Sequence, residues 1–214
     1  GAGKSTLVNL LLRFYDPTAG RITIDGVDLR EYDLARLRRH FGLVLQEDFL
    51  FAGTLRDNLV MEREEVDEEA LELALDASQA GAIVARLPAG LEDKVAERGA
   101  TFSTGERQIF AIARALAGNP RIVILDEATA SVDSNTEAQI EHATRELLQG
   151  RSALVIAHRL STVRRANRIL VLHRGKLREQ GTHAELLAQN GIYARLYQLQ
   201  FADPSTATES VAAT

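Results

Sequence analysis

The chain has 214 residues, of which 45% are hydrophobic and 26% charged, so it is long enough to bury one full α/β core with room for a small second lobe. It contains no cysteine, which excludes a disulfide framework and any thiolate metal site. A net charge of −5 argues against a nucleic-acid partner, and no apolar run approaches the roughly 20 residues that a membrane-spanning helix needs.

The chain opens with a phosphate-binding motif. Gly3-Lys4-Ser5 matches the end of G-x-x-x-x-G-K-[ST], in which backbone N–H groups and the lysine bind phosphate and the hydroxyl holds Mg²⁺. Because the first part of the motif would precede residue 1, we expect that an N-terminal part with at least one core strand is missing. Leu7–Phe14 is apolar on nearly all sides and predicts a helix buried against a sheet. By itself, the run Gly3-Lys4-Ser5-Thr6 is also compatible with an ordinary helix start.

The next segments predict a small β element and a short helix. Arg21–Asp28 alternates apolar and polar residues around a turn at Asp25-Gly26, which is typical of an antiparallel hairpin. Asp33 is placed to cap a helix over Leu34–Arg39, and the arginines of that helix are expected to face solvent.

The middle of the chain predicts helices. Residues 62–86 are expected to be mostly helical, with Ser78 capping the second helix of the pair. Ser103-Thr104-Gly105 precedes a strong helix over Ile109–Ala117, which is the arrangement of an anion-binding helix N-terminus. A capping box between Ser103 and Glu106 accounts for the same residues, and the spacing alone favours it.

Polar residues follow three apolar runs that predict strands. They are Gln46 after Phe41–Leu45, Asp126 and Glu127 after Ile122–Leu125, and His158 after Ser152–Ile156. Four branched apolar residues in succession suit a parallel strand covered on both faces. Since open α/β sheets bind ligands at the carboxyl ends of their strands, we expect these side chains at one rim. Asp126 and Glu127 alone could be an acidic turn, but beside a phosphate-binding motif Asp126 supplies the second Mg²⁺-side group of a P-loop nucleotidase.

The remaining segments predict further helices and a hairpin. The expected elements are a helix over residues 136–148, a hairpin of 169–172 and 176–179, and helices near 184–187 and 192–201. The Ser/Thr/Ala-rich residues 203–214 are expected to be disordered.

Five motifs in this order resemble the nucleotide-binding domain of an ABC transporter of the exporter type, over about residues 1–201. GAGKST resembles the end of Walker A, and LVLQEDFLFAGTLRDNL resembles the Q-loop region. ERGATFSTGERQ resembles the X-loop followed by the signature. RIVILDEATASVD resembles Walker B with the D-loop, and VIAHRLSTVRRANRILVL resembles the switch histidine region. The departures are an incomplete Walker A, no upstream aromatic to stack on adenine, and Thr104 at the first glycine of the signature. Phe102 and Glu106 also replace its Leu and Gln.

The resemblance implies a P-loop α/β fold with a mostly parallel sheet, a small antiparallel β element and an α-helical subdomain that carries the signature. Residues 1–202 would be the ATP-binding domain, with the helical subdomain at about 55–118 and a tail at 203–214.

The resemblance also implies roles for individual residues. Gly1, Ala2, Gly3, Lys4, Ser5 and Thr6 would bind ATP, and Ser5, Gln46 and Asp126 would hold Mg²⁺. Glu127 would polarise the attacking water, with Gln46 and His158 near the γ-phosphate. Ser103, Gly105 and, in the D-loop, Asp133 would face the ATP of a partner domain.

The implied partners are a second nucleotide-binding domain in a head-to-tail dimer and a transmembrane domain, at the cytoplasmic face of a membrane. The loop after Gln46 would receive the transmembrane domain's coupling helix. The alternative is a soluble ABC ATPase of DNA repair or translation. A long coiled coil would separate Gln46 from Ser103 in the repair class, and a basic linker with a second domain marks the translation class. The sequence has none of these features. A simple P-loop kinase would have no use for the STGERQ segment.

Overall fold

The computed structural model describes residues 2–45, 49–63, 65–96, 99, 101–126, 133–157 and 160–201. The chain divides into two compact units. The larger unit is Asn9–Ile156, and the smaller one combines Gly1–Val8 with Ala157–Thr214. In the part of the chain that is described, no helix combines the length and apolarity needed to cross a membrane.

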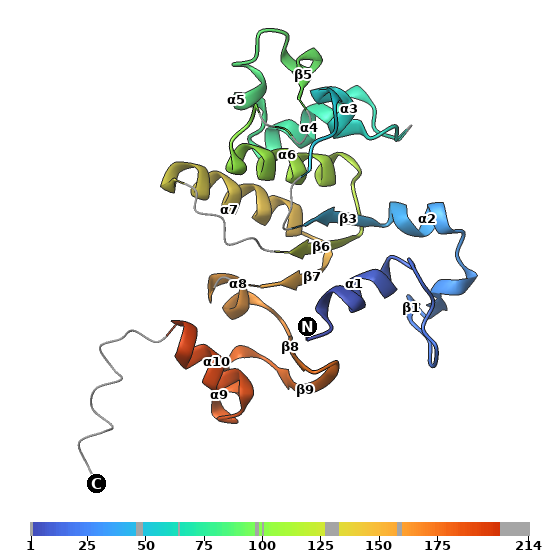
Figure 1. Cartoon of the computed structure of the whole chain (residues 1–214), viewed down its shortest axis with the longest axis vertical. Coiled ribbons are helices and arrows are strands. Elements are labelled where there is room, and N and C mark those ends of the chain that lie inside the picture. Colours follow the sequence, from blue (N-terminus) through green and yellow to red (C-terminus); the bar gives the residue numbers. More distant parts are fainter. Residues whose placement is uncertain are drawn as a thin grey trace, which may run out of the picture. The chain divides into compact units, whose positions relative to one another are not determined.

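A parallel three-stranded sheet forms the centre of the larger unit (Figure 1). Its strands are β3 (Phe41–Val44), β6 (Ile122–Asp126) and β7 (Ser152–Ile156), in the order β3-β6-β7. The middle strand is the run of branched apolar residues, and its Val123, Ile124 and Leu125 are almost fully buried, as expected for a strand covered on both faces. The predicted α/β fold with a parallel sheet is therefore confirmed.

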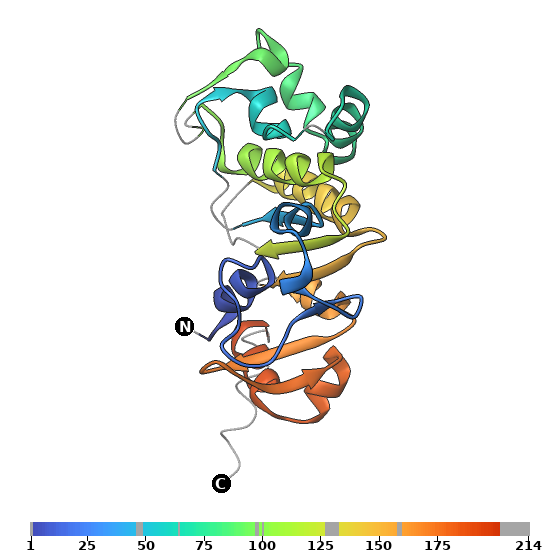
Figure 2. The same cartoon turned by 90° about the vertical axis from the view of Figure 1, so that its right-hand side faces the viewer.

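Two long helices cover this sheet. They are α6 (Thr104–Ala117) and α7 (Ser134–Leu148). The two helices pack against each other, and α6 also packs on β3 (Figure 2). The fully buried Ile109, Phe110 and Ile112 of α6 join the apolar residues of β6 in one core cluster.

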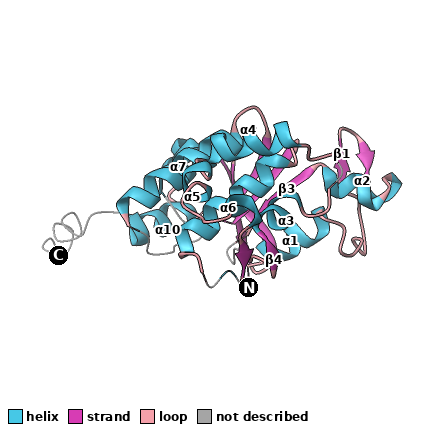
Figure 3. Ribbon diagram, turned by 90° about the horizontal axis from the view of Figure 1, so that it is seen from above, coloured by secondary structure: helices cyan, strands magenta, loops and turns pink. Residues whose placement is uncertain are grey.

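Shorter helices pack on the other side of α6. They are α3 (Leu55–Val60), α4 (Glu68–Ser78) and α5 (Gly81–Val84), with the 3₁₀ turn η2 (Gly90–Glu92) and the strand pair β4 (Gly53–Thr54) and β5 (Lys94–Val95). Helix α4 contacts both α6 and α7, and α3 contacts α6 (Figure 3). Helix α3 was not predicted, although Thr54 and Asp57 form a capping box at its start and the T-x-x-D spacing is a sequence signal for one.

The predicted hairpin and short helix are both present in the larger unit. Strands β1 (Thr23–Ile24) and β2 (Val27–Asp28) pair across Asp25 and Gly26, whose φ angles are 50° and 85°, as a two-residue hairpin turn requires. The 3₁₀ turn η1 (Leu29–Glu31) leads to α2 (Leu34–Arg39). Asp33 caps α2 as predicted, accepting a hydrogen bond from the backbone N–H of Arg36.

The smaller unit contains the predicted late hairpin and C-terminal helices. Its elements are α8 (Leu160–Arg165), β8 (Ile169–His173), β9 (Lys176–Gly181), α9 (His183–Ala188) and α10 (Ile192–Phe201). Val171, Leu186 and Tyr193 form its core. The Glu179 carboxylate accepts the N–H groups of Ile192 and Tyr193 at 2.6 and 2.9 Å, which joins α10 to the hairpin by capping its first turn.

Two helix predictions were wrong in part. The segment Leu7–Phe14 was expected to form a helix buried against a sheet. Helix α1 (Lys4–Leu11) is present, but only Val8 is buried within it, and Phe14, beyond its end, is 59% exposed. Arg13 adopts a left-handed φ of 50°, so the chain turns away before Phe14 could extend the helical face. The apolar content of a segment does not determine how much of it other elements cover.

The second correction concerns residues 62–86. Met61 and Glu62 have left-handed φ angles where α3 ends, and α4 begins only at Glu68, where the Asp67 carboxylate caps it by accepting the N–H of Ala70. Ser78 ends α4, where its hydroxyl donates to the carbonyl of Ala74, whereas α5 follows Ala80 without a side-chain cap. The Ser78 oxygen also accepts the N–H of Ala80 at 3.3 Å, but it does not cap the N–H groups in the first turn of α5. The predicted tail at 203–214 lies outside the described residues, and the predicted domain limits remain predictions.

We predict that Leu71→Ala lowers the free energy of unfolding by about 2–5 kcal/mol, because it leaves a cavity in the core. Leu71 is 1% exposed, whereas Leu73 on the same helix is 64% exposed. Leu73→Ala is therefore the matched control and should cost no more than about 0.5 kcal/mol. Urea unfolding followed by circular dichroism measures both values, and equal losses would contradict the burial of this face of α4.

Candidate nucleotide-binding site

The start of α1 presents free hydrogen-bond donors. The first helical hydrogen bond runs from Leu7 N–H to the Gly3 carbonyl at 3.1 Å. The backbone N–H groups of Lys4, Ser5 and Thr6 therefore have no partner within the helix, and the three side chains are exposed. N–H groups and a lysine at a helix start are the arrangement that binds phosphate.

Gly3 allows the backbone to enter this helix. Its φ of 99° lies in the region that side chains rarely adopt. A Cβ atom there would also lie 3.4 Å from the Cα of Gly175 in the β8–β9 turn. The same turn is tied to the motif by a hydrogen bond of 3.1 Å from the Gly175 N–H to the Ala2 carbonyl. Within the smaller unit, the hairpin thus supports the phosphate-binding motif.

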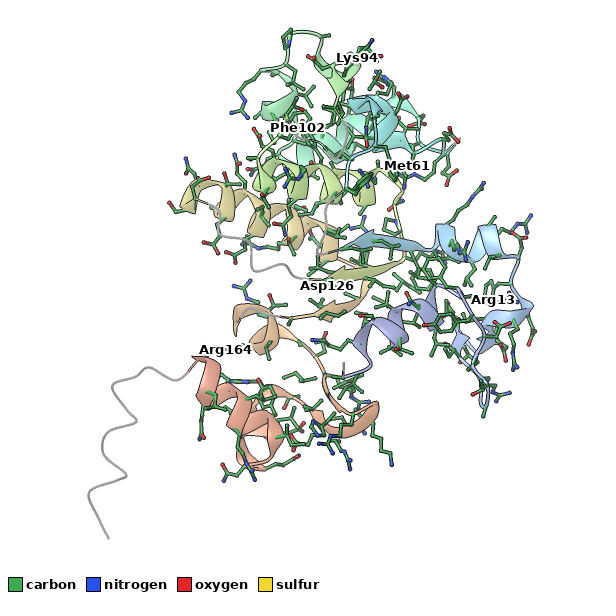
Figure 4. The ribbon with its side chains drawn as sticks, viewed as in Figure 1. Arg13, Met61, Lys94, Phe102, Asp126 and Arg164 are labelled. Atoms are coloured by element: carbon green, nitrogen blue, oxygen red, sulfur yellow. The ribbon has the colours of Figure 1, made fainter. Side chains whose placement is uncertain are left out.

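Asp126 is the last residue of β6 and is half-buried (Figure 4). Leu125 lies beside Val44 of β3, and Asp126 lies beside Ile156 of β7. The three parallel strands therefore end level with one another at one edge. Gly1, Gln46, Glu127 and His158 lie outside the described residues, so their roles remain predictions, but the strands that precede Gln46, Glu127 and His158 end at this edge.

The signature segment forms the start of α6. Ser103 accepts the N–H of Glu106 at 3.1 Å, and Glu106 accepts the N–H of Ser103 at 2.9 Å, so the capping box is present. Glu106 also accepts from Arg86 at 2.6 Å. The Ser103 hydroxyl uses an acceptor lone pair in the cap and keeps its own hydrogen for another group. Capping and anion binding are therefore compatible at Ser103, and the buried Gly105 follows within the first turn.

Asp133 is the N-cap of α7. Its carboxylate accepts the N–H groups of Asn135 and Thr136 at 3.1 and 3.0 Å, and hydrogen bonds from Thr136 hold the pKa of Asp133 below its usual value. Its demonstrated contacts are local, and its role toward a partner's nucleotide remains a prediction.

Asn58 and Arg114, whose roles were not predicted, hold the segment that follows Gln46. Asn58 is 1% exposed and bonds both the N–H and the carbonyl of Phe51, at 2.7 and 2.9 Å. Arg114 of α6 donates to the carbonyls of Asn58 and Phe49 at 2.8 and 3.0 Å. This segment is thereby fixed to the helix that begins with the signature. No sequence signal identifies such side-chain bonds to distant carbonyls.

Each of the two units contributes a side chain of the kind that Mg²⁺ binds. The Ser5 hydroxyl and the Asp126 carboxylate are hard oxygen ligands of the kind that Mg²⁺ binds. Residues 2–45, 49–63, 65–96, 99, 101–126, 133–157 and 160–201 include no group of three or more His, Asp or Glu side chains that could hold a metal. A magnesium site with few protein ligands is nevertheless ordinary, because Mg²⁺ usually keeps waters and binds substrate phosphates.

Comparison with known proteins decides the family. The profile of the ABC transporter family matches residues 1–130. The chain belongs to the ABC transporter family. The resemblance inferred from the sequence motifs is thereby confirmed.

Relatives of this ABC transporter chain cover nearly all of it. It is 47% identical over 204 residues to an ATP-dependent lipid A-core flippase of Chromobacterium violaceum, covering 95% of this chain and 35% of the flippase. It is 47% identical over 200 residues to the Bacillus subtilis protein named "Probable multidrug resistance ABC transporter ATP-binding/permease protein YheH", covering 94% of this chain and 30% of that protein. The chain thus spans about a third of the length of these ABC transporter relatives.

A solved ABC transporter structure has the same fold. It is the structure of a bacterial Atm1-family ABC exporter with ATP bound, which matches with a TM-score of 0.85 and 42% identity. The match covers 95% of this chain and 36% of that one. At this identity the likeness extends beyond fold to the family.

We predict that Asp133→Ala lowers the urea midpoint of this ABC transporter domain at pH 7, because α7 loses its cap. The pKa of Asp133 is depressed in the folded state. Its ionised form therefore stabilises the fold above the unfolded-state pKa of about 3.9, and this contribution is lost as the pH falls through the folded-state value. The difference from wild type should thus shrink below about pH 4. Asp133→Asn keeps a capping oxygen and should lose less at pH 7; a deficit that persists unchanged into acid would contradict this role.

Proposed function

We propose that this chain is the ATP-binding and ATP-hydrolysing motor domain of an ABC-type membrane exporter. The main support is that three parallel strands end at the same edge of the sheet. Gln46, Glu127 and His158 follow these three strands in the sequence. Residues 1–202 would be the ATP-binding domain, and residues of about 55–118 its helical subdomain. The relatives named as a flippase and as an ATP-binding/permease protein, together with the exporter that binds ATP, support the same function.

The proposed reaction is hydrolysis of ATP to ADP and phosphate. Glu127 would accept a proton from a water molecule as the water oxygen forms a bond to the γ-phosphorus, and would pass that proton on to the released phosphate. The bond to the β–γ bridging oxygen breaks, and its electron pair leaves with ADP. Gln46 and His158 would orient the water and the γ-phosphate. Such catalysis depends mostly on positioning and charge stabilisation.

Binding of the nucleotide would be shared among the remaining residues. Residues 1–6 would hold the phosphates, with the Lys4 ammonium opposite their charge. Mg²⁺, held by Ser5, Gln46 and Asp126, would neutralise charge on the β- and γ-oxygens. Ser103 and Gly105, with Asp133, would face the ATP of a partner domain in a head-to-tail dimer.

The proposed setting is the cytoplasmic face of a membrane, where the segment after Gln46 would receive a transmembrane domain. The permease part of the Bacillus subtilis relative's name supports a membrane partner. The alternative, a soluble ABC ATPase of repair or translation, is less well supported. Between Phe49 and Ser103 the described residues form short helices, a 3₁₀ turn and one two-residue strand pair, whereas the repair class would need a long coiled coil there.

We predict that Glu127→Gln in the full-length protein lowers ATP turnover by about 10²- to 10⁴-fold while ATP binding remains, because a positioned base contributes that much. Phosphate release measures turnover, and a fluorescent ATP analogue measures binding. Glu72→Gln, at an exposed position of α4, is the matched control and should turn over normally. Near-normal turnover in Glu127→Gln would refute the proposed role of this carboxylate.

We predict that Lys4→Ala impairs ATP binding, the step that precedes hydrolysis. Removing a cation that faces phosphate oxygens weakens charge-assisted hydrogen bonds, so we expect ATP affinity of the full-length protein to fall by about tenfold or more. Calorimetric titration measures the affinity. Lys176→Ala removes an exposed lysine of β9 and should leave the affinity as it is. If both variants bind ATP as tightly as the wild type, the phosphate-binding role of residues 1–6 is wrong.

A further inference from the structure

The turn between α9 and α10 contains a chemically reactive pair of residues. Asn190 is the one asparagine of the sequence that is followed by glycine. Asn190 and Gly191 lie after Ala188, where α9 ends, and before Ile192, where α10 begins (Figure 1). The Asn190 side chain is exposed, and its backbone has a left-handed φ of 49°. Neither residue is therefore protected by a position inside a helix or strand.

The backbone N–H of Gly191 is available to react. In the part of the chain that the structure describes, it donates no hydrogen bond. Its neighbours both have partners, since Asn190 N–H donates to the Leu187 carbonyl at 3.1 Å and Ile192 N–H donates to the Glu179 carboxylate at 2.6 Å. Because glycine has no Cβ, its nitrogen can approach the preceding side chain with little steric hindrance. An exposed side-chain amide thus adjoins an unpaired N–H.

We propose that Asn190 is a site of spontaneous deamidation, and that the isoaspartate formed there releases α10 from Glu179. The Gly191 nitrogen gives its proton to hydroxide or water and forms a bond to Cγ of Asn190. The bond from Cγ to Nδ2 breaks, and Nδ2 takes up a proton and leaves as ammonia, which closes a succinimide ring. Water then adds to one of the two ring carbonyls, and the C–N bond at that carbonyl breaks. The ring opens to aspartate or to isoaspartate without oxidation or reduction, and water is the co-reactant.

Isoaspartate alters the start of α10. In this product the main chain runs through the former side chain, which adds a carbon atom between positions 190 and 191. Glu179 accepts the N–H groups of Ile192 and Tyr193 at 2.6 and 2.9 Å. A Cβ atom at Gly191 would overlap Oε1 of Glu179, so this carboxylate packs directly against the backbone that is lengthened. The extra atom displaces the two N–H groups, and the first turn of α10 loses its cap.

The other asparagines lack this combination of features. Asn167 is exposed and lies outside the helices and strands, but the side chain of Arg168 hinders approach of the next nitrogen. Asn58 is 1% exposed, and its amide is bonded to backbone carbonyls. Asn119 precedes a proline, which has no N–H. Two others lie inside helices, namely Asn9 of α1 and Asn135 of α7. Asn167 is therefore the matched internal control.

The first test is peptide mapping by mass spectrometry after the purified full-length protein has been incubated at physiological temperature. We expect the mass gain of amide hydrolysis in residues 179–195, the tryptic peptide that contains Asn190. The product should consist of two isomers, of which one is methylated by an isoaspartyl methyltransferase. The rate should rise with pH, because the Gly191 nitrogen must lose its proton. Asparagine is among the thermolabile residues, so heating should accelerate the change.

The Asn190→Gly variant is the matched control for this measurement. Glycine suits the left-handed φ at this position and has no side-chain amide, so the mass gain in residues 179–195 should disappear while the fold is kept. Asn167 should stay unmodified in the wild type. Equal rates at Asn167 and Asn190, or a mass gain at Asn190 only after unfolding in urea, would overturn the proposal.

Hydrogen exchange tests the release of α10. We expect the N–H groups of Ile192 and Tyr193 to exchange about tenfold faster or more in the isoaspartate form, the size of a lost hydrogen bond to a charged group. Glu179→Ala provides the reference for a helix start without its cap. Asn190→Asp adds a charge without lengthening the backbone and should stay within about twofold of the wild type, because acidic groups are tolerated near a helix N-terminus. Unchanged exchange in the isoaspartate form, or an equal rise in Asn190→Asp, would show that the lengthened backbone does not release the helix.

Discussion

The parallel pairing of β6 with β3 and β7 is the constraint on which the rest of the larger unit depends. Because β6 is apolar at every position from Ile122 to Leu125, it can be buried only between two strands and under helices on its faces. The register then makes all three strands end at one edge. Each strand has a polar residue at its end or within two positions of it, namely Gln46, Asp126 and His158, and the carboxyl ends of parallel strands are where open α/β sheets bind ligands.

Most of the helices in the described residues are capped at their N-termini by side chains. Capping boxes begin α3, α6 and α9, and single aspartates cap α2, α4 and α7. Each cap satisfies backbone donors that would otherwise need water or a ligand. At α6 the same residues, Ser103 and Glu106, belong to the segment that resembles the signature, so the interaction that begins the helix also fixes the first turn of that segment.

Side-chain bonds to distant carbonyls connect these helices to the segment after Gln46. Arg114 reaches from α6 to Asn58 and Phe49, and Arg63 reaches from the end of α3 to the carbonyl of Arg114 at 2.9 Å. Burial lowers the pKa of Arg63, but an arginine remains charged and must be fully hydrogen-bonded when it is buried. Two reciprocal arginines therefore resist movement of α3 relative to α6.

The sequence by itself determined the features that depend on neighbouring residues. The three parallel strands, the Asp25-Gly26 hairpin and the Asp33 cap were found this way, because propensity, periodicity and turn chemistry act within a few positions. The family was indicated separately, by the resemblance of five ordered motifs to those of ABC transporters. Tertiary structure decided the rest: the exposure of Phe14 and the hydrogen bonds by which Asn58 and Arg114 hold Phe51 and Phe49. These features depend on which surfaces meet and on which distant carbonyls come within reach of a long side chain. The spacing of residues along the chain predicts neither the contacting surfaces nor these hydrogen bonds, because both form only when the helices and strands pack together.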